Sequence, residues 1–280
     1  MFPPDMPPVK NRPLYIYRIA AKLFSFFMFG LGSLVLVTIA FPIMRLVLHP
    51  RERFRKYGRR LVSSTFRLFV FIMHFIGIVN LKIDDREKYR NLSSKIIVAN
   101  HPSLIDVVIL ISLIPNADCI VNGYVGDIFI VKEIVRQLYI LNSLDLDSVL
   151  RSCAESLKQG NCLIIFPEGT RTRRSGKIIL KKGSARVALY SGYNIVPIHI
   201  GGTDKYGLGK KDPMFSFNTR NRWVYNLNMG PEISPEKYRD LSAPKAVRAI
   251  TREMAAFIFP AKDASVMDES IDREGENDEK

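Results

Sequence analysis

The sequence predicts an α/β fold with a mainly parallel central sheet flanked by helices and preceded by an N-terminal membrane-anchoring helical segment. Short apolar runs rich in β-branched residues alternate with segments of helical periodicity, and this alternation favours parallel strands that are covered on both faces. At 280 residues with 47% hydrophobic content, the chain can bury one sizeable core. The anchor is predicted because the 22 residues from 23 to 44 carry no charge.

The N-terminal region divides into a leader and an apolar run. Residues 1–22 are rich in proline and then basic, so we expect a disordered leader. As a helix, the uncharged run would extend about 33 Å, enough to cross a hydrocarbon core of about 30 Å. A signal peptide is the competing interpretation, but the run is too long and seven basic residues follow it closely. This charge bias predicts that the bulk of the protein faces the cytoplasm.

Residues 61–81 form a second apolar segment. Only residues 68–81 of it carry no Asp, Glu, Lys or Arg, and this stretch is too short to cross a bilayer as a helix. We expect a helix that lies at the membrane interface or packs back against the first one. Gly30, Gly32 and Pro42 allow the first helix to kink, so a monotopic hairpin is the alternative to a span. Residues 23–81 are therefore predicted to form the membrane-anchoring helices.

The charge distribution predicts an anionic partner. The formal net charge is +14, although residues 261–280 hold eight acidic and three basic side chains and are expected to form an acidic disordered tail. No aromatic platform or recognition motif points to nucleic acid, and the basic residues flank apolar runs, so an anionic membrane surface fits better. The three cysteines lack metal-ligand spacing and are predicted to be buried thiols, with no metal site.

The first polar cluster follows an apolar β-branched run. His101 is predicted at the end of this strand and Asp106 in the first turn of the next helix, so a carboxylate could fix the tautomer of an imidazole general base. The alternative is helix capping, because Ser103 and Asp106 have capping spacing. The same offset recurs at His199 and Asp204, but His199 lies in an alternating apolar run that favours a residue on a strand face.

The rest of the chain is predicted to continue as strands and helices. Gly160 is well placed to end an amphipathic helix. The predicted strands are 117–124, 161–166 and 222–229, and the predicted helical segments are 128–141, 148–158 and 235–259.

The second polar cluster lies at the end of a predicted strand, where open α/β sheets place their ligand sites. Pro167 and Gly169 suit a tight turn. Arg171 is a natural bidentate phosphate ligand with Thr170 as an extra donor, and Glu168 could hold that arginine or bind a substrate hydroxyl. The alternative is a surface turn with a solvated basic run.

A third basic stretch, residues 180–184, places cations at the start of a predicted helix. Such a position is a ready anion site, to which Lys182 would contribute. The alternative is that Lys182 is simply an exposed residue at a helix start.

Together these stretches resemble four ordered blocks of the 1-acylglycerol-3-phosphate acyltransferase (phospholipid/glycerol acyltransferase) family. The blocks are Asn-His-Pro-Ser-Leu-Ile-Asp at 100–106, Phe-Pro-Glu-Gly-Thr-Arg at 166–171, Lys-Lys-Gly at 181–183 and Ile-Val-Pro-Ile at 195–198. Their order, their intervals and the preceding membrane segment all agree with the family. The resemblance implies an acyltransferase domain over residues 82–260.

The resemblance also implies roles for the residues. His101 would deprotonate an acceptor hydroxyl for attack on an acyl thioester, and Asp106 would orient it. The expected donor is acyl-CoA or acyl carrier protein, the expected acceptor is a glycerol-phosphate-type or lysophospholipid hydroxyl, and no cofactor is expected. The expected location is the bacterial inner membrane, with the catalytic domain in the cytoplasm. The substrate-binding residues would be Glu168, Gly169, Thr170, Arg171, Lys182 and Pro197.

Two alternatives to this function remain. Family members that use simple glycerol phosphates usually carry a lysine and an Ile-Asp-Arg-like triplet in the region of residues 121–124 and 141–143. This chain has Val-Asn-Gly-Tyr and Leu-Asn-Ser there, so it lacks the arginine that would bind a small phosphate. The chain also resembles a bacterial branch associated with aryl polyene lipids, so an acyltransferase for a specialised lipid is one alternative. The other is a non-catalytic lipid-binding scaffold, against which the presence of both His101 and Asp106 argues.

Overall fold

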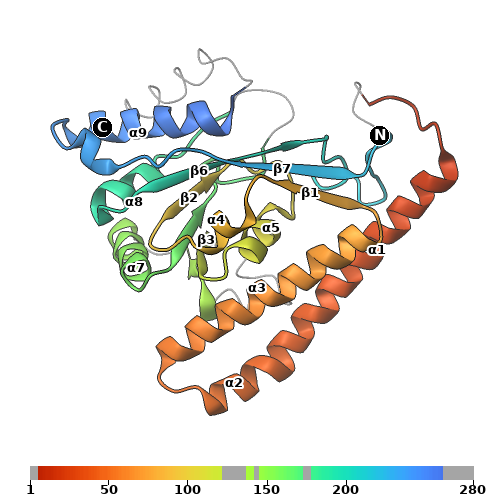
Figure 1. Cartoon of the computed structure of the whole chain (residues 1–280), viewed down its shortest axis with the longest axis horizontal. Helices are drawn as coiled ribbons and strands as arrows, with labels where there is room; N and C mark the ends of the chain where they lie inside the picture. The colour runs from red at the N-terminus through yellow and green to blue at the C-terminus, as the bar shows by residue number, and fades with distance from the viewer. Residues whose placement is uncertain (1–5, 122–136, 142–144, 173–177, 261–280) are drawn as a thin grey trace.

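The computed structural model describes residues 6–121, 137–141, 145–172 and 178–260 (Figure 1). Its centre is a seven-stranded sheet with the order β1-β7-β6-β2-β5-β3-β4. Neighbouring strands are parallel except for β6 and β7, which are antiparallel. The strands are β1 (Val79–Ile83), β2 (Ile96–Ala99), β3 (Ala117–Val121), β4 (Ile140–Leu141), β5 (Cys162–Ile165), β6 (Ile195–Gly202) and β7 (Trp223–Met229). The predicted mainly parallel α/β fold is confirmed.

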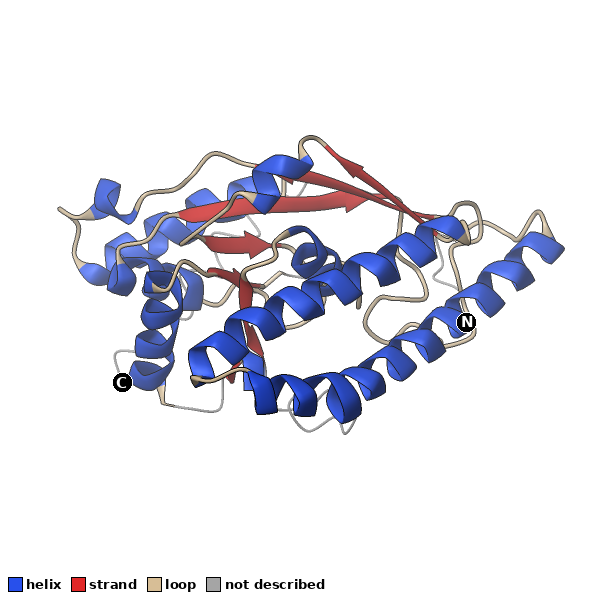
Figure 2. Cartoon of the chain, turned by 60° about the horizontal axis from the view of Figure 1, so that its bottom comes forward, coloured by secondary structure: helices blue, strands red, loops and turns tan. Residues whose placement is uncertain are grey.

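Helices cover both faces of the sheet (Figures 1 and 2). One face packs against the N-terminal helices and α5, and the other against α7, α8 and α9. The helices of the domain are α4 (Arg86–Arg90), α5 (Asp106–Leu113), α7 (Leu146–Lys158), α8 (Gly183–Ser191) and α9 (Ala243–Ile258), with a 3-10 turn at Pro235–Tyr238. The predicted helix 148–158 and the helical region 235–259 are confirmed.

Strand β2 explains why the sheet is covered on both sides. Its side chains are all apolar and buried, and they alternate between the two cores. Ile97 and Ala99 face the N-terminal helices, whereas Ile96 and Val98 face α7, α8 and α9. Because a strand turns successive side chains to opposite faces, a run with no polar residue has to be buried between two layers.

The N-terminal residues form a helix sooner than predicted. Helix α1 (Arg12–Val35) continues through a π-helical turn, Leu36–Ala40, into α2 (Phe41–Val47). The Asn11 side chain caps α1 by accepting a hydrogen bond from the Leu14 amide at 3.0 Å, and a proline lies in the first turn. The prediction of a disordered leader is therefore wrong for residues 12–22, while residues 1–5 and the predicted tail 261–280 lie outside the described residues.

Helix α3 (Arg51–Phe75) runs back along α1, as Figure 2 shows. Phe29 of α1 contacts the rings of Phe66 and Phe69 at centroid distances of 5.9 and 5.4 Å. The second apolar segment thus packs against the first, which is one of the two predicted arrangements. Its helix ends at Phe75 because Gly77 has a φ of +76°, and β1 begins before the predicted domain boundary at residue 82.

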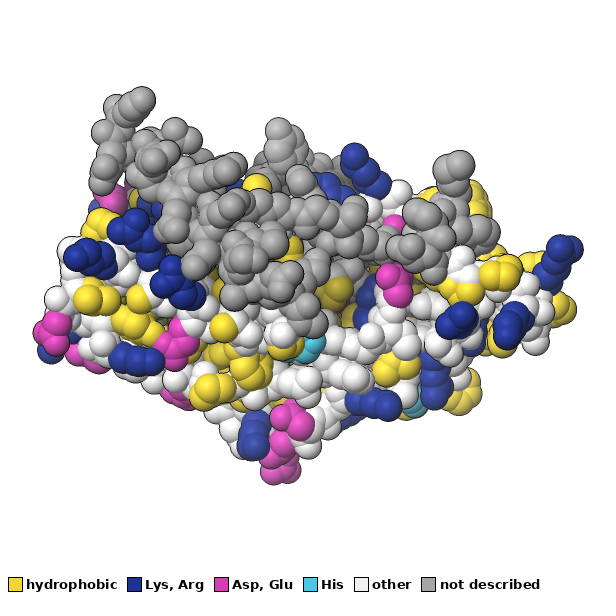
Figure 3. Space-filling view, turned by 90° about the horizontal axis from the view of Figure 1, so that it is seen from above, with side chains coloured by type: hydrophobic (Ala, Val, Ile, Leu, Met, Phe, Trp, Pro, Cys, Tyr) yellow, Lys and Arg dark blue, Asp and Glu magenta, His cyan; other side chains and the backbone are white. Residues whose placement is uncertain are grey.

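The N-terminal segment retains the properties expected of a membrane anchor. Among the described residues, one helix, Arg12–Val47, is long and apolar enough to cross a bilayer. Only 17% of its most apolar window is buried inside the protein, so its apolar side chains mostly face outward. Lys and Arg side chains gather at the end of the molecule where α1 begins (Figure 3).

Candidate active site

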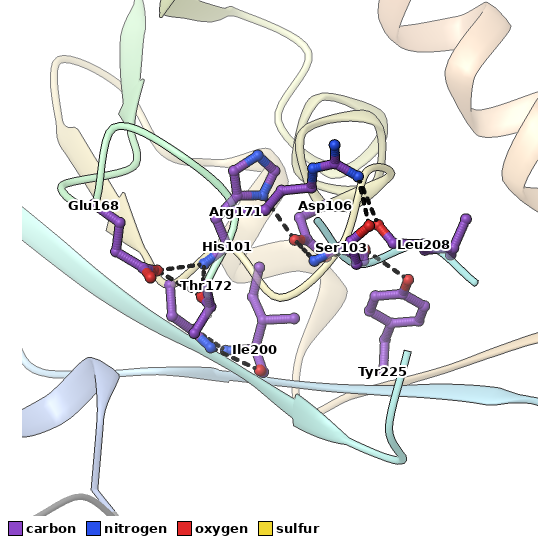
Figure 4. Close-up of polar contacts among 11 residues, drawn as sticks. His101, Ser103, Asp106, Glu168, Arg171, Thr172, Ile200, Leu208 and Tyr225 are labelled. Atoms are coloured by element: carbon purple, nitrogen blue, oxygen red, sulfur yellow. Dashed lines mark hydrogen bonds and ion pairs between the residues drawn. The ribbon is translucent and has the colours of Figure 1, made fainter. Parts of the chain in front are cut away.

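The site is built at the carboxyl ends of β2 and β5, which are neighbouring parallel strands. Just after β2, the Asn100 side chain pairs with the backbone of β6. Its Nδ2 donates to the Ile200 carbonyl at 3.0 Å and its Oδ1 accepts from the Ile200 amide at 2.7 Å. These two bonds fix the chain where it leaves the sheet, so His101 lies just past the carboxyl end of β2 (Figure 4).

His101 and Asp106 form the predicted pair. The His101 Nδ1 lies 2.8 Å from the Asp106 Oδ2, and the Asp106 side chain is fully buried. The same carboxylate accepts from the Ser103 amide at 2.6 Å and from the Ser103 hydroxyl at 2.5 Å. Asp106 lies in the first turn of α5, as predicted, but the N-cap residue is Ile105 and has no side-chain cap hydrogen bond. The Asp106 carboxylate instead holds the Ser103 turn and the histidine, so the capping interpretation is wrong.

The geometry fixes which nitrogen of His101 accepts a proton. Because the buried Asp106 carboxylate accepts hydrogen bonds, it retains hydrogen on Nδ1 and leaves the Nε2 lone pair available. The Phe166 ring stacks on the imidazole with a centroid distance of 4.1 Å and an interplanar angle of 19°. The imidazole therefore has a carboxylate at its Nδ1 and an aromatic ring stacked on its face.

Glu168 holds the histidine loop. Its Oε1 accepts from the His101 amide at 3.1 Å and from the Thr172 hydroxyl at 2.6 Å. The Thr172 amide in turn donates to the His101 carbonyl at 2.7 Å. The sequence predicts that Glu168 holds Arg171 or binds a substrate hydroxyl, whereas these contacts join it to the loop that carries His101.

Arg171 is anchored to a second loop, residues 203–222 between β6 and β7. Its Nη1 donates to the carbonyls of Leu208 and Gly209 at 3.1 and 2.9 Å (Figure 4). Next to it, the Thr170 hydroxyl accepts from Lys210 of the same loop at 2.9 Å. Part of the charge of Arg171 is therefore used to position this loop.

Gly169 forms the predicted tight turn. Its φ is +62°, and a Cβ added there would lie 2.8 Å from the Cε of Lys181. The turn therefore favours glycine for its backbone conformation and because the Lys181 side chain crosses it.

Lys182 and Pro197 lie on other elements. Lys182 is the N-cap residue of α8, and its carbonyl accepts the first helical bond, from the Arg186 amide, at 3.0 Å. Pro197 is buried in β6 opposite Val98, and its carbonyl accepts from the Gly230 amide at 2.8 Å. Their roles in substrate binding stay predictions.

Tyr225 and Lys205 are additions that the sequence did not predict. The Tyr225 hydroxyl lies 2.8 Å from the Ser103 hydroxyl, so it extends the hydrogen-bond chain behind Asp106. The Lys205 Nζ lies 4.6 Å from the centre of the Tyr225 ring. Burial lowers the pKa of Lys205 to about 8, against the opposing effect of the Asp106 and Asp204 charges. A tyrosine in an alternating strand gave no sequence signal for this role.

His199, the alternative base, has a different environment. It lies on β6, and its Nδ1 is 2.9 Å from the Ile258 carbonyl at the end of α9. It joins the sheet to the last helix, as expected for a histidine on a strand face.

The region that carries this site matches a known protein family. The sequence profile of the Acyltransferase family matches residues 80–201, which include the His101–Asp106 pair and the turn at Gly169. This part of the chain is therefore similar to the acyltransferase family. The match ends in β6, so the profile covers the strands that carry the site.

Three relatives are 1-acyl-sn-glycerol-3-phosphate acyltransferases. This chain is 28% identical to the chloroplastic enzyme of Arabidopsis thaliana, over 61% of this chain and 48% of the relative. It is 27% identical to the Cocos nucifera enzyme, over 68% of this chain and 60% of the relative. It is 30% identical to the Helicobacter pylori enzyme, over 53% of this chain and 65% of the relative. The aligned regions thus span less than two thirds of each relative's length.

A solved structure has the same fold. The 1-acyl-sn-glycerophosphate (LPA) acyltransferase PlsC from Thermotoga maritima superposes with a TM-score of 0.67 at 20% identity. The superposition covers 89% of this chain and 99% of that chain, so the fold is shared over most of the length.

Proposed function

We propose that this acyltransferase moves a fatty acyl group from acyl-CoA or acyl carrier protein to the free hydroxyl of 1-acyl-sn-glycerol-3-phosphate. The observation that carries the proposal is the His101–Asp106 pair, in which a fully buried carboxylate orients an imidazole just past the carboxyl end of β2. The names of the three relatives support this acceptor.

The reaction needs one base. His101 Nε2 takes the proton of the acceptor hydroxyl as its oxygen attacks the thioester carbonyl carbon. Asp106 stabilises the imidazolium that forms. The tetrahedral intermediate collapses, the carbon–sulfur bond breaks, and the thiolate leaves and takes the proton back from the imidazolium. A thioester is already activated, so positioning and one base are sufficient without a covalent enzyme intermediate.

The acceptor phosphate would bind near the turn at Gly169. Three cationic side chains surround this turn: Arg171 follows it, Lys210 contacts Thr170, and Lys181 crosses the glycine. Arginine and lysine are the usual ligands of a phosphate, and backbone amides of the turn would add donors. Because this turn contacts the loop of His101 through Glu168, a phosphate bound there would lie close to the base.

The N-terminal hairpin would attach the enzyme to the membrane from one side. The turn that joins α2 to α3 is followed by exposed cations, including Arg53 and Arg55, which do not favour the hydrocarbon core. Exposed apolar side chains line the helices instead, and they include Phe24, Phe27, Leu31, Leu34, Ile39, Ile43, Leu68, Phe71 and Phe75. We propose a hairpin lying in the cytoplasmic leaflet, at the inner membrane of a bacterium.

The first experiment compares the two histidines. Thiol release from acyl-CoA and from acyl carrier protein is measured for wild type, His101→Ala and His199→Ala, with lysophosphatidate or a total lipid extract as acceptor. Loss of the base is expected to reduce turnover by about 10²–10⁴-fold, whereas His199→Ala keeps activity per folded molecule. Normal turnover by His101→Ala would show the mechanism to be wrong.

The same assay separates the alternative functions. The specialised-lipid alternative rests on residues 121–124 and 141–143, and of these 122–124 and 142–143 lie outside the described residues. Turnover with the lipid extract but not with lysophosphatidate would support that alternative. No turnover with any donor or acceptor would support the non-catalytic scaffold.

A further inference from the structure

Lys22 is a buried lysine near the start of the apolar helix. Its side chain is fully buried in α1 and its Nζ donates to three backbone carbonyls of the 203–222 loop. The distance is 2.6 Å to Ser216 and 3.5 Å to Gly207, and the third acceptor is Met214. An ammonium has three hydrogens, and burying it is costly unless they are used, so these contacts define a specific site.

A second cation of α1 holds the same loop. Arg18 precedes Lys22 by four residues, so the two side chains lie on one face of the helix. Its Nη1 donates to the Arg220 carbonyl at 3.3 Å, and its guanidinium lies 5.8 Å from the centre of the Phe217 ring. The helix therefore holds the loop at two points.

The other side of the loop contacts the active site. The Leu208 carbonyl accepts from the amide of Leu104, which lies between His101 and Asp106, at 3.0 Å, and from Arg171 at 3.1 Å. The acceptors of Lys22 and Arg171 are thus adjacent, at Gly207 and at residues 208 and 209.

Hydrogen bonds and a close backbone contact hold this short segment in shape. The Asp212 Oδ2 accepts from the amides of Gly207 and Gly209 at 2.7 and 2.8 Å. Gly207 has a φ of +93°, and a Cβ there would lie 2.3 Å from the Ser216 carbonyl oxygen. A displacement at Lys22 would therefore be transmitted to Arg171 rather than absorbed within the loop.

We propose that Lys22 is a positioning residue for the acceptor site. It acts from the membrane-facing helix through residues 207–216, and this segment fixes the guanidinium of Arg171 and the loop of His101. The inference rests on the proposed function, because it assigns Arg171 to binding the acceptor phosphate. The position of α1 in the bilayer and the affinity of the enzyme for the acceptor are then linked through the Lys22 side chain.

The test compares Lys22→Met with Lys10→Met in full-length protein in phosphatidylglycerol-containing vesicles. Lys10 is exposed in the same basic leader, so its variant removes the same charge without touching the loop. We expect Lys22→Met to raise KM for lysophosphatidate about tenfold, the effect of a lost hydrogen-bonded contact, and to leave KM for acyl-CoA unchanged. In an Arg171→Ala background the same substitution is expected to have no further effect on KM.

Three results would overturn the proposal: an unchanged acceptor KM in Lys22→Met, an equal change in Lys10→Met, or effects that multiply with Arg171→Ala. If Lys22→Met does not fold, Arg18→Gln replaces it. A smaller rise in the same KM is then expected, and no rise refutes the proposal.

A measurement without turnover separates this inference from the proposed function. Amide hydrogen exchange over residues 205–219 and at Leu104 is expected to accelerate in Lys22→Met and not in Lys10→Met. If wild type fails to acylate lysophosphatidate, the proposed function is wrong, and unchanged exchange would show that Lys22 does not position the loop either.

Discussion

Replacing Asp106 with asparagine separates the charge of this side chain from its hydrogen bonds. The two carboxylate oxygens have different partners: Oδ2 accepts from His101 and from the Ser103 amide, and Oδ1 accepts from the Ser103 hydroxyl. With its oxygen in the Oδ2 position, asparagine keeps the first two bonds. Its amide nitrogen then faces the Ser103 hydroxyl, which can accept and turn its own hydrogen to Tyr225, 2.8 Å away.

This rearrangement sets the size of the stability loss. The Tyr225 hydroxyl loses Ser103 as an acceptor, and a buried unsatisfied donor costs about 1–3 kcal/mol. We expect the free energy of unfolding to fall by that amount. Activity is expected to fall further, because the His101 tautomer is kept but the negative charge that stabilises the imidazolium is lost. A reduction of kcat by about 10²–10⁴-fold corresponds to about 3–5 kcal/mol of activation free energy.

Both quantities can be measured on one protein. Urea unfolding is followed by the fluorescence of Trp223, the single tryptophan, which is fully buried in β7. Turnover is measured with acyl-CoA and lysophosphatidate at saturation. The control is Asp204→Asn, the same chemical change at an exposed position in the second pair of this spacing. If Asp106→Asn keeps more than about a tenth of kcat, the carboxylate charge is not needed and the reasoning is refuted.

Three further predictions concern stability and thiol reactivity. Arg59→Met is expected to lower the free energy of unfolding by about 3–5 kcal/mol in urea titrations, because it leaves the buried Asp118 carboxylate without the guanidinium 2.7 Å away. Gly202→Ala is expected to cost more than about 2 kcal/mol in the same assay, because φ is +103° and the new Cβ would lie 2.0 Å from the Val224 carbonyl oxygen. The cysteine thiols are expected to react with a chromogenic disulfide at pH 8 only after unfolding, because burial raises their pKa values. These thiols are Cys119, Cys153, whose pKa rises to about 12, and Cys162, whose pKa rises to about 11.

Each of these expectations has a contrary result. Wild-type stability in Arg59→Met would mean that Asp118 does not depend on its partner, and the double variant Arg59→Met/Asp118→Asn should recover part of the loss. An unchanged free energy of unfolding in Gly202→Ala would show that the pairing of β6 with β7 can relax at Gly202. The control is Gly30→Ala, because a Cβ at Gly30 meets no neighbouring atom. Fast thiol labelling of the native protein would contradict the burial of the cysteines.

Periodicity determined the fold class, because it is a local property of the sequence. Completely apolar runs such as residues 96–99 have to lie between two layers, and this requirement predicts parallel strands with helices on both faces. The His101–Asp106 pair was also predictable, since five residues across one strand-to-helix turn bring both side chains together. Residues 128–136 of the predicted helix 128–141 lie outside the described residues, and the prediction is wrong at its end, where Ile140–Leu141 form β4.

Tertiary structure alone decided which distant side chains complete the site. Glu168 contacts the His101 amide across 67 residues and Tyr225 contacts Ser103 across 122, and both contacts depend on the order of strands in the sheet. No local pattern specifies that order, because every buried strand presents the same backbone amides and carbonyls to its neighbours. In the sequence, Arg18 and Lys22 cannot be distinguished from basic residues that are exposed to solvent. Only the packing of a loop almost 200 residues away supplied the carbonyls that make burying Lys22 possible.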